Sequence, residues 1–155
     1  MNKKEITAVC AFVFDKDGNI LAVKNSRGWD IPGGNVEQGE SPDRAVIREV
    51  FEEASVIVDN AQLFHIQEFS SLGWRIAYYH CNLIEIKTFQ KEFETTHREF
   101  MSISDFLSVY GGEDLKETDE LIAKAQEVFN TYSASFDFLK NEPELYSKSD
   151  LRKRY

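Results

Sequence analysis

The chain has 155 residues, a length typical of one domain, and 42% of them are hydrophobic, which excludes a disordered or low-complexity chain. Its formal net charge is −9, which also argues against general nucleic-acid binding, because such proteins place basic side chains against the phosphate backbone. No stretch approaches the roughly 20 apolar residues that a membrane span requires. We therefore predict a soluble single domain over residues 1–155.

Two apolar, β-branched runs open the chain, at residues 6–14 and 20–24, and the five turn-forming residues between them predict a β-hairpin. No small-residue cleavage site follows the first run, so we do not interpret it as a signal peptide. Cys10 and Cys81 lack the spacing of a disulfide framework or a zinc site, which is typical of incidental thiols in a reducing compartment. We expect a cytoplasmic protein.

Residues 25–34 carry three glycines and one proline, which predicts an irregular segment. Ser41 as N-cap, followed by Pro42, predicts the start of a helix that runs to about Ala54. Three strands are expected after this helix, at residues 56–58, 63–69 and 75–86. The last of them is long and rich in Ile, Tyr and Leu, which favours a central position in a sheet.

The polar residues 88–98 show no pattern that selects a helix or a strand. A short strand over residues 100–103, a helical turn capped by Ser104 and a longer helix capped by Thr118 are predicted to follow. The longer helix has an apolar stripe at helical spacing, made of Leu121, Ile122, Ala125, Val128, Phe129 and Tyr132. Residues 133–155 are either an added helix or a C-terminal tail.

The predicted helix over residues 42–54 has two different faces. Its apolar face comprises Val46, Ile47, Val50, Phe51 and Ala54. The opposite side carries Glu49, Glu52 and Glu53. Like charges at this spacing destabilise a helix by about a few tenths of a kcal/mol per pair, and a hard divalent cation would reverse that interaction. Such a cluster on its own is most often a solvated surface, so its meaning depends on the flanking residues.

A fixed pattern runs from Gly34 to Val56: a glycine, five residues, a glutamate, seven residues, Arg-Glu-Val, one residue, Glu-Glu, two residues and an aliphatic residue. It resembles the Nudix box of the Nudix hydrolases, in which a glycine precedes the last aliphatic position. Ser55 stands at that position here. Because glycine tolerates the left-handed backbone that ends many helices, we expect the serine to cost some stability or shift the turn without removing a ligand.

The resemblance implies an α/β fold: an α/β/α sandwich with a curved mixed β-sheet, in which the box forms a loop–helix–loop. It extends beyond the box to the predicted hairpin, to residues 29–34 and to residues 99–103. Residues 133–155 lie outside what the resemblance explains.

The resemblance also implies an activity. Nudix hydrolases cleave a pyrophosphate linkage in a nucleoside diphosphate joined to another group, by attack of water on phosphorus with Mg²⁺ or Mn²⁺ bound. A diphosphate brings negative charge to an acidic site, so cations are needed between the two. By position, Glu52 and Glu53 are implied as metal ligands together with the Gly33 carbonyl. Glu49 is implied as a further ligand or as the group that orients or deprotonates the water.

Arg48 is implied in the catalytic machinery as the side chain that holds a glutamate in place by a charge-assisted hydrogen bond. Glu40 is implied as a structural contact at the start of the box. Relatives often recruit a glutamate from outside the box as ligand or general base, and Glu94 is the candidate here, with Glu92 and Glu99 as rivals. The alternative is that Glu94 is one more solvated loop acid.

Asn25, Arg27 and Trp29 precede the box on the side where the substrate is expected to enter. Arg27 is a candidate for a phosphate contact and Trp29 for stacking on a base. Each has an equally good structural interpretation, with Trp29 filling the edge of the core. No catalytic role is assigned to the three histidines, which share no metal spacing: His65, His80 and His97.

The leading interpretation is a metal-dependent Nudix pyrophosphohydrolase acting on a nucleoside triphosphate, a dinucleotide or a nucleotide sugar such as ADP-ribose. The small size favours the first group, and the acidic charge disfavours RNA ends. The alternative is a non-catalytic nucleotide-binding regulatory module on the same fold, although such modules tend to lose box carboxylates. An isoprenoid diphosphate isomerase would need a reactive cysteine, and Cys81 lies in a strand pattern without a visible activator. The sequence leaves open which nucleotide is preferred and whether the chain forms a homodimer.

Overall fold

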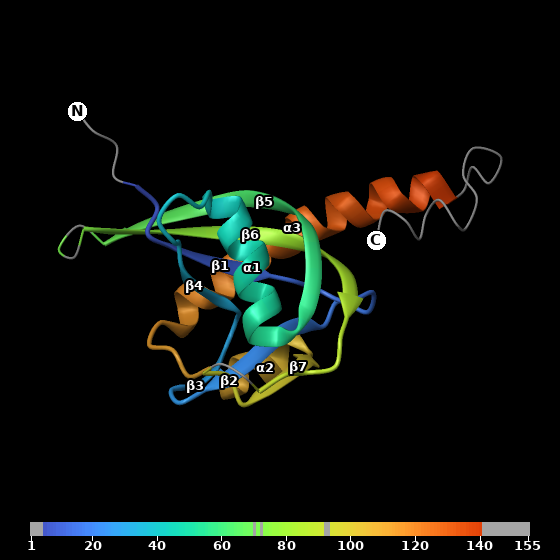
Figure 1. The fold of residues 1–155 in the computed structure, drawn as a ribbon. Helices are drawn as coiled ribbons and strands as arrows, with labels where there is room; N and C mark the ends of the chain where they lie inside the picture. Colours follow the sequence, from blue (N-terminus) through green and yellow to red (C-terminus); the bar gives the residue numbers. More distant parts are fainter. Residues whose placement is uncertain (1–4, 70, 72, 92–93, 141–155) are drawn as a thin grey trace.

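The computed structural model describes residues 5–140 except 70, 72, 92 and 93 (Figure 1). Ten helices and strands follow one another in these residues: β1 (Ala8–Phe12), β2 (Ile20–Asn25), β3 (Gly28–Asp30), β4 (Gly33–Asn35), α1 (Pro42–Ala54), β5 (Val56–Phe69), β6 (Trp74–Ile86), β7 (His97–Met101), α2 (Ile103–Val109) and α3 (Leu115–Lys140).

The strands form two sheets. Four strands lie in the order β4-β1-β6-β5, and three in the order β3-β2-β7. β1 and β6 run parallel, whereas the other paired strands are antiparallel, so the larger sheet is mixed. β6 has β1 on one side and β5 on the other, which confirms the central position predicted for it.

The hairpin predicted from the first two apolar runs is wrong beyond its turn. The turn itself is present: Phe14 and Ile20 form an isolated antiparallel bridge, and the Leu21 amide donates to the Val13 carbonyl oxygen at 2.8 Å. Beyond this bridge β1 pairs with β4 and β6, whereas β2 pairs with β3 and β7. The two runs separate because each is apolar on both faces and finds strand partners elsewhere in the chain.

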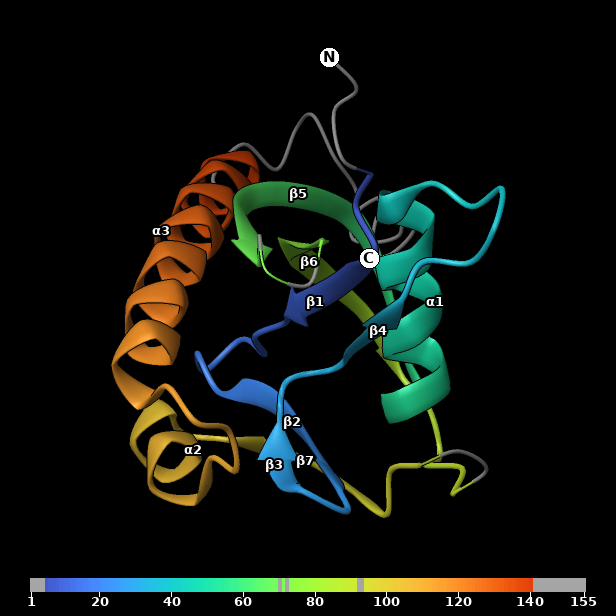
Figure 2. The ribbon, with the colours of Figure 1, turned by 90° about the vertical axis from the view of Figure 1, so that its left-hand side faces the viewer.

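Helices cover both sides of the strands, as the predicted α/β/α sandwich requires. In Figure 2 α1 lies on one side of the sheets, and α3 and α2 lie on the other. The β1 region follows the period of two: Val9 and Ala11 belong to the core cluster that includes α1, whereas Phe12 and Phe14 belong to the cluster that includes α2 and α3. This alternation is why one strand can serve two helical layers.

α1 begins and ends where the sequence predicted. Ser41 is extended at the N-cap, Pro42 is the first helical residue and Ala54 the last. Four α1 residues are buried: Ala45, Val46, Val50 and Ala54. Phe51, on the predicted apolar face, is not buried with them, since the residue is 50% exposed. Phe51 lies at the edge of the apolar arc, and the small Ala45 takes a place on the buried face instead.

β5 is one long strand, where the sequence predicted two. Its pairing with β6 shifts register at three points, and Asn60 has a φ of 48°. These irregularities absorb the polar residues between the two apolar runs without ending the ladder.

The next boundaries lie a few residues earlier than predicted. The predicted strand over residues 100–103 is β7, which runs from His97 to Met101, and Ser102 rather than Ser104 caps α2, accepting from the Asp105 amide at 3.1 Å.

Asp114 rather than Thr118 caps α3, because its carboxylate accepts from the Glu117 amide at 2.9 Å. Thr118 lies inside the helix, where its hydroxyl donates to the Asp114 carbonyl oxygen at 2.9 Å.

Four of the six residues predicted for the apolar stripe of α3 lie in its core cluster, and the side chain of Tyr132 lies outside what the structure describes. Leu121, Ile122 and Ala125 are buried, and Phe129 packs against the same cluster. The helix continues to Lys140 and projects past the strands (Figure 1). The segment predicted as an added helix or a tail is therefore helical at its start, and residues 141–155 lie outside the described residues. Among the described residues, no helix combines the length and the low polarity that a membrane crossing needs.

Candidate active site

The Arg48 side chain lies at the centre of the charged residues on α1. Its Nε donates to Glu40 Oε2 at 2.7 Å and its Nη2 to Glu40 Oε1 at 2.9 Å, a bidentate ion pair between two largely covered side chains. This pairing holds the pKa of Glu40 down at about 2, with the hydrogen bonds from Arg48 as the main cause. Glu40 also accepts from the Glu37 amide at 3.1 Å. The structural contact predicted for Glu40 is confirmed.

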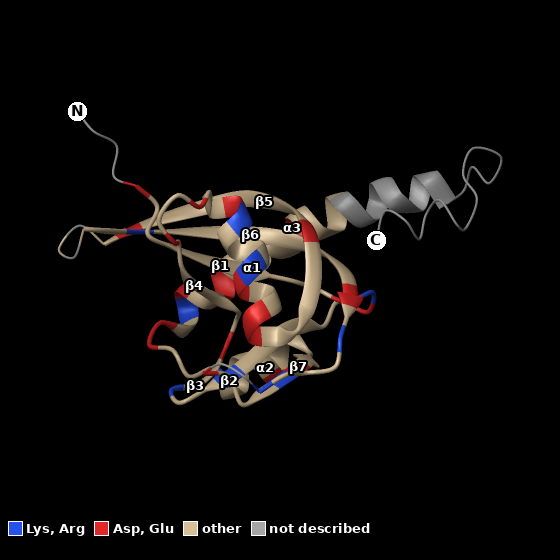
Figure 3. Cartoon of the chain, viewed as in Figure 1, with Lys and Arg blue, Asp and Glu red and all other residues tan. Residues whose placement is uncertain are grey.

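The same guanidinium reaches two further glutamates. Nη1 donates to Glu49 Oε1 at 2.9 Å and to Glu52 Oε2 at 3.0 Å, and Nη2 donates to the Asn35 carbonyl oxygen at 3.0 Å. Arg48 therefore joins the loop before α1 to the acidic face of the helix, as its predicted role of holding a glutamate requires. Figure 3 shows acidic and basic positions interspersed along α1.

Glu53 is turned toward the backbone of β4. Its Oε1 accepts from the Gly33 amide at 2.7 Å. Burial raises the pKa of Glu53 to about 7, with the charges of Glu49, Asp30 and Glu94 adding to the rise and the Gly33 amide opposing it. The carboxylate is thus fixed beside other acids in a poorly solvated place. A metal contact from the Gly33 carbonyl stays a prediction.

Glu49 lies directly over Gly34. A Cβ atom at Gly34 would overlap the carboxyl carbon and both oxygens of Glu49. The Glu49 side chain is only 14% exposed, and burial raises its pKa even though the Arg48 hydrogen bond opposes the shift. A side chain at Gly34 would therefore displace the Glu49 carboxylate from its present place.

The carboxylates suit a divalent cation. As they stand, no three His, Cys, Asp or Glu side chains among the described residues come close enough to hold a metal ion. However, Mg²⁺ is usually bound by one or two carboxylates and keeps several waters. The charge of Glu49 makes Glu53 harder to ionise, and the hydrogen bonds given above occupy one oxygen of each carboxylate, Glu49 Oε1 and Glu53 Oε1. The other oxygen of each carboxylate, Glu49 Oε2 and Glu53 Oε2, is a hard donor of the kind that Mg²⁺ prefers. The residues therefore fit Mg²⁺ or Mn²⁺.

Three of the residues predicted outside the box come together. Asn25, Arg27 and Glu94 line a cavity of about 630 Å³ together with Ser26. Asn25 Oδ1 accepts from the Arg27 amide at 2.8 Å and so shapes the turn between β2 and β3. Of the two rivals for the role of Glu94, Glu99 is exposed in β7, and Glu92 lies outside the described residues. The substrate and proton-transfer roles of these residues stay predictions.

Trp29 lies at the edge of the core. Its ring is partly buried against the cluster formed with α2 and α3, and its centroid is 6.3 Å from that of His97. This agrees with the structural interpretation of Trp29, and stacking on a base stays a prediction. His80 is 1% exposed and packs against the rings of Phe14 and Phe129.

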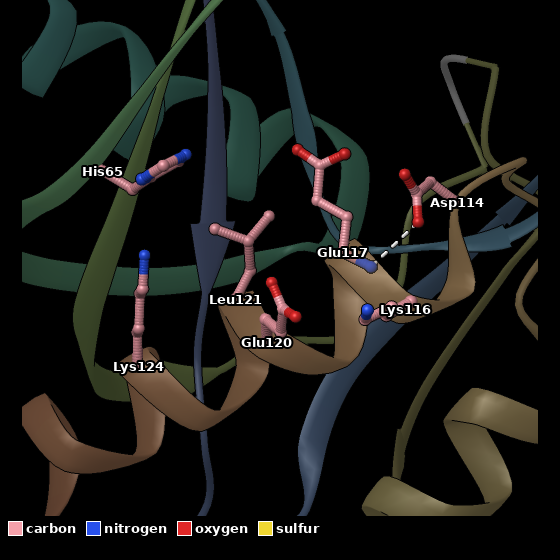
Figure 4. Close-up of a pocket in the computed structure, with 7 residues that line it drawn as sticks. All are labelled: His65, Asp114, Lys116, Glu117, Glu120, Leu121 and Lys124. Atoms are coloured by element: carbon pink, nitrogen blue, oxygen red, sulfur yellow. Dashed lines mark hydrogen bonds between the residues drawn. The ribbon is translucent and has the colours of Figure 1, made fainter.

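A separate cavity of about 400 Å³ lies at the start of α3 (Figure 4). Its lining is of mixed charge: His65, Asp114, Lys116, Glu117, Glu120, Leu121 and Lys124. Burial and, after it, the charge of Lys124 lower the pKa of His65. Because acids and bases alternate around this cavity, its charges largely offset one another, unlike the acidic group on α1.

Several residues at the C-terminal end of α1 escaped prediction. Thr95 Oγ1 donates to the Glu53 carbonyl oxygen at 2.6 Å, and Arg98 Nη1 donates to the Ala54 carbonyl oxygen at 2.8 Å. Asp30 is a further, partly buried acid near Glu53, and burial raises its pKa. Thr95 and Arg98 lie in a polar stretch without periodicity, so no local signal marks them. For Asp30, its position as a single acid between Trp29 and Ile31 could have indicated a partly buried carboxylate.

Comparison with known proteins agrees with this geometry. The NUDIX domain family model matches residues 4–123. The chain therefore belongs to the NUDIX family, as the box indicated. A solved ADP-ribose pyrophosphatase from Streptococcus suis has a TM-score of 0.64 and 28% identity, over 78% of this chain and 89% of that one. A NUDIX hydrolase from Nitrosomonas europaea, at 20% identity, has a TM-score of 0.64 over 79% of this chain and 90% of that one. The Nudix-type α/β/α fold is confirmed.

Curated relatives match over shorter parts of their length. Nudix hydrolase 5 of Arabidopsis thaliana is 26% identical over 79% of this chain and 45% of its own length. The 8-oxo-dGTP diphosphatase of Haemophilus influenzae is 32% identical over 44% of this chain and 55% of its own. Diphosphoinositol polyphosphate phosphohydrolase 3-alpha of Mus musculus is 42% identical over 35% of this chain and 34% of its own. The chain thus spans about a third to a half of the length of these relatives.

Proposed function

We propose that this protein is a metal-dependent Nudix pyrophosphohydrolase that cleaves a nucleoside diphosphate linked to another group by attack of water on phosphorus. The observation that carries the proposal is the placement of Glu49 and Glu53 against Gly33 and Gly34, with Arg48 bonded to Glu49 beside them. Two poorly solvated carboxylates at one backbone edge, with Glu49 opposing the ionisation of Glu53, are a costly arrangement unless a cation binds there. The names of the Streptococcus suis and Haemophilus influenzae relatives point to the same kind of bond.

Four groups would hold Mg²⁺ or Mn²⁺: the carboxylates of Glu49, Glu52 and Glu53 and the Gly33 carbonyl. When bound, the cation would offset the phosphate charges and acidify the attacking water. Arg48 keeps Glu49 and Glu52 oriented through its Nη1 hydrogen bonds, so that their second oxygens stay directed away from the guanidinium.

The residues around the larger cavity serve the substrate. Glu94 takes the proton of the attacking water as general base, since it is exposed at the cavity and its charge reaches Glu53. Arg27 and Asn25, which line the same cavity, donate to phosphate oxygens. Trp29 stacks on the base with the part of its ring that the core leaves uncovered.

The proposed substrate is a small nucleotide, with a nucleoside triphosphate, damaged or intact, ahead of ADP-ribose and dinucleotides. The net charge of −9 disfavours long polyanions such as RNA ends. A purely regulatory nucleotide-binding module is less well supported, because the three box glutamates and Arg48 are all present: Arg48 is bonded to Glu49 and Glu52, and Glu53 to the Gly33 amide.

A panel of dGTP, 8-oxo-dGTP, ADP-ribose and diadenosine tetraphosphate, each with Mg²⁺, tests the proposal. Product release measured by chromatography should identify at least one substrate, and EDTA should stop the reaction until Mg²⁺ is added back. Glu53→Gln should lower kcat about a thousandfold, because it removes a ligand charge needed in the transition state. Glu113→Gln, at an exposed site between α2 and α3, is the matched control and should keep the wild-type rate. No product from any nucleotide, or full activity of Glu53→Gln, would refute the proposal.

A further inference from the structure

Ser55, the residue that replaces the box glycine, keeps the backbone conformation of that glycine. Its φ is 55° and its ψ 41°, in the left-handed region, and its amide donates to the Phe51 carbonyl oxygen at 2.9 Å as the C-cap of α1. The residue is 4% exposed. Since a side chain is disfavoured in this region, the serine carries a conformational cost that a glycine would not. A compensating contact of the side chain is therefore expected.

The Ser55 hydroxyl makes such a contact. Ser55 Oγ accepts from the Gln90 amide at 3.0 Å, and the Ser55 carbonyl oxygen accepts from the Lys87 amide at 2.9 Å. A glycine would retain the second bond and lose the first. The hydroxyl thus fixes the chain at Gln90, a few residues after the end of β6.

Two further side chains attach the connection between β6 and β7 to the same helix end. Thr95 Oγ1 donates to the Glu53 carbonyl oxygen, and Arg98 Nη1 donates to the carbonyl oxygens of Ala54 and Lys87, at 2.8 and 2.6 Å. The last carbonyls of a helix have no partner within it, and a cation there is favoured by the helix dipole. These contacts hold the connection from both of its ends.

Glu94 lies between the two attachments. It directly precedes Thr95 and follows Gln90 by four positions, and both of these residues are bonded to the helix end. Glu94 also lines the cavity with Arg27 and acts electrostatically on Glu53. A bond from Ser55 to Gln90 therefore limits where the Glu94 carboxylate can lie.

We propose that Ser55 is a positioning residue: its hydroxyl holds the chain at Gln90 so that Glu94 is presented to the acidic face of α1. The proposal rests on the proposed function, in which Glu94 takes the proton of the attacking water. A glycine at this position, as in the family pattern, has no hydroxyl and could not hold Gln90 in this way.

Ser55→Gly is the decisive variant, because glycine accepts the left-handed backbone and removes only the hydroxymethyl group. kcat should fall about tenfold, as expected for a displaced catalytic group, while KM and the Mn²⁺ dissociation constant stay at their wild-type values. The thermal midpoint should be unchanged or higher, whereas a purely structural role of the serine predicts a lower one. Amide exchange measured by NMR should quicken at Gln90 and remain the same at Lys87, whose bond to the backbone is retained.

A double-mutant cycle connects the effect to Glu94. Ser55→Gly should lower kcat in the wild type and have no further effect in Glu94→Gln, because the two changes then disable one group. Ser108→Ala is the control, since that hydroxyl donates to the Asp105 carbonyl oxygen within α2, and it should leave kcat unchanged.

Wild-type kcat in Ser55→Gly, unchanged exchange at Gln90, or additive effects with Glu94→Gln would each overturn the proposal. Failure of the proposed function would show differently, as absence of turnover in the wild type on every nucleotide. In that case amide exchange at Gln90 still decides whether the hydroxyl anchors the chain.

Discussion

One side chain, Arg48, makes more polar contacts in the candidate site than any single glutamate of the box. Its guanidinium donates to Glu40, Glu49 and Glu52 and to one backbone carbonyl. The forked geometry matters, because two nitrogens face the two oxygens of Glu40 while the third remains for Glu49 and Glu52. A lysine has a single ammonium group and cannot occupy both positions.

Replacing Arg48 by lysine should therefore separate charge from geometry. We expect kcat to fall about 10- to 100-fold and Mn²⁺ affinity to weaken, because Glu49 and Glu52 lose the group that orients them. Steady-state kinetics and calorimetric titration with Mn²⁺ measure the two effects. Arg44→Lys, at an exposed position one turn earlier on α1, is the control. Wild-type kinetics for Arg48→Lys would show that the fork is dispensable.

Among the elements, α1 could be predicted from the sequence, whereas the strands and side chains that contact it could not. The helix and its acidic side follow from spacing within fewer than twenty residues, and the bonds from Arg48 join residues of the same segment. The partners of β1 and β2 depend on strands far along the chain, so the hairpin prediction was wrong. Thr95 and Arg98 likewise reach α1 across more than forty positions. Periodicity carries no information about such pairs.

A second long-range contact positions β3 against the connection between α2 and α3. The Gly111 amide donates to the Trp29 carbonyl oxygen at 2.9 Å. A Cβ at Gly111 would lie 3.1 Å from Gly28 Cα and would overlap the Arg27 carbonyl oxygen. Both obstacles are backbone atoms, so they cannot move aside as a flexible side chain could.

Gly111→Ala should therefore destabilise the protein by about 2 kcal/mol and raise KM for the nucleotide, because the turn that carries Arg27 must shift. Thermal or urea unfolding and steady-state kinetics are the measurements. Gly18→Ala is the comparison: its Cβ would meet nothing within 4 Å, so only the cost of its φ of 81° applies. Equal stability losses and equal KM values for the two variants would contradict the predicted contact.

At the scale of the whole molecule, α3 packs on the strands through a cluster of aromatic rings, and one of these rings is the titratable imidazole of His80. The His80 ring packs against Phe14 and Phe129, with centroid distances of 6.0 and 5.8 Å, and those two rings also contact each other. Within the part of the chain that the structure describes, neither nitrogen of this ring has a hydrogen-bond partner. Burial lowers the pKa of His80 from 6.5 to about 4. The sequence predicted the apolar stripe on α3 but not the burial of His80. The position of His80 depends on the pairing of β6 with β1, in which His80 lies opposite Phe12.

Stability should consequently depend on pH through His80. In the unfolded chain the His80 imidazole binds a proton below pH 6.5, whereas in the folded protein it stays neutral down to about pH 4. Between these two pH values, acid therefore favours unfolding. Above pH 6.5 the group is neutral in both states and does not affect stability. We expect His80 to remove about 2 kcal/mol of unfolding free energy between pH 7.5 and pH 5. His80→Phe should lack this loss, so its stability relative to the wild type should rise by that amount on acidification. Urea unfolding at the two pH values measures it, with the exposed His97→Phe as control. If the unfolding free energies of His80→Phe and wild type differ by the same amount at both pH values, the buried imidazole does not cause the loss of stability in acid.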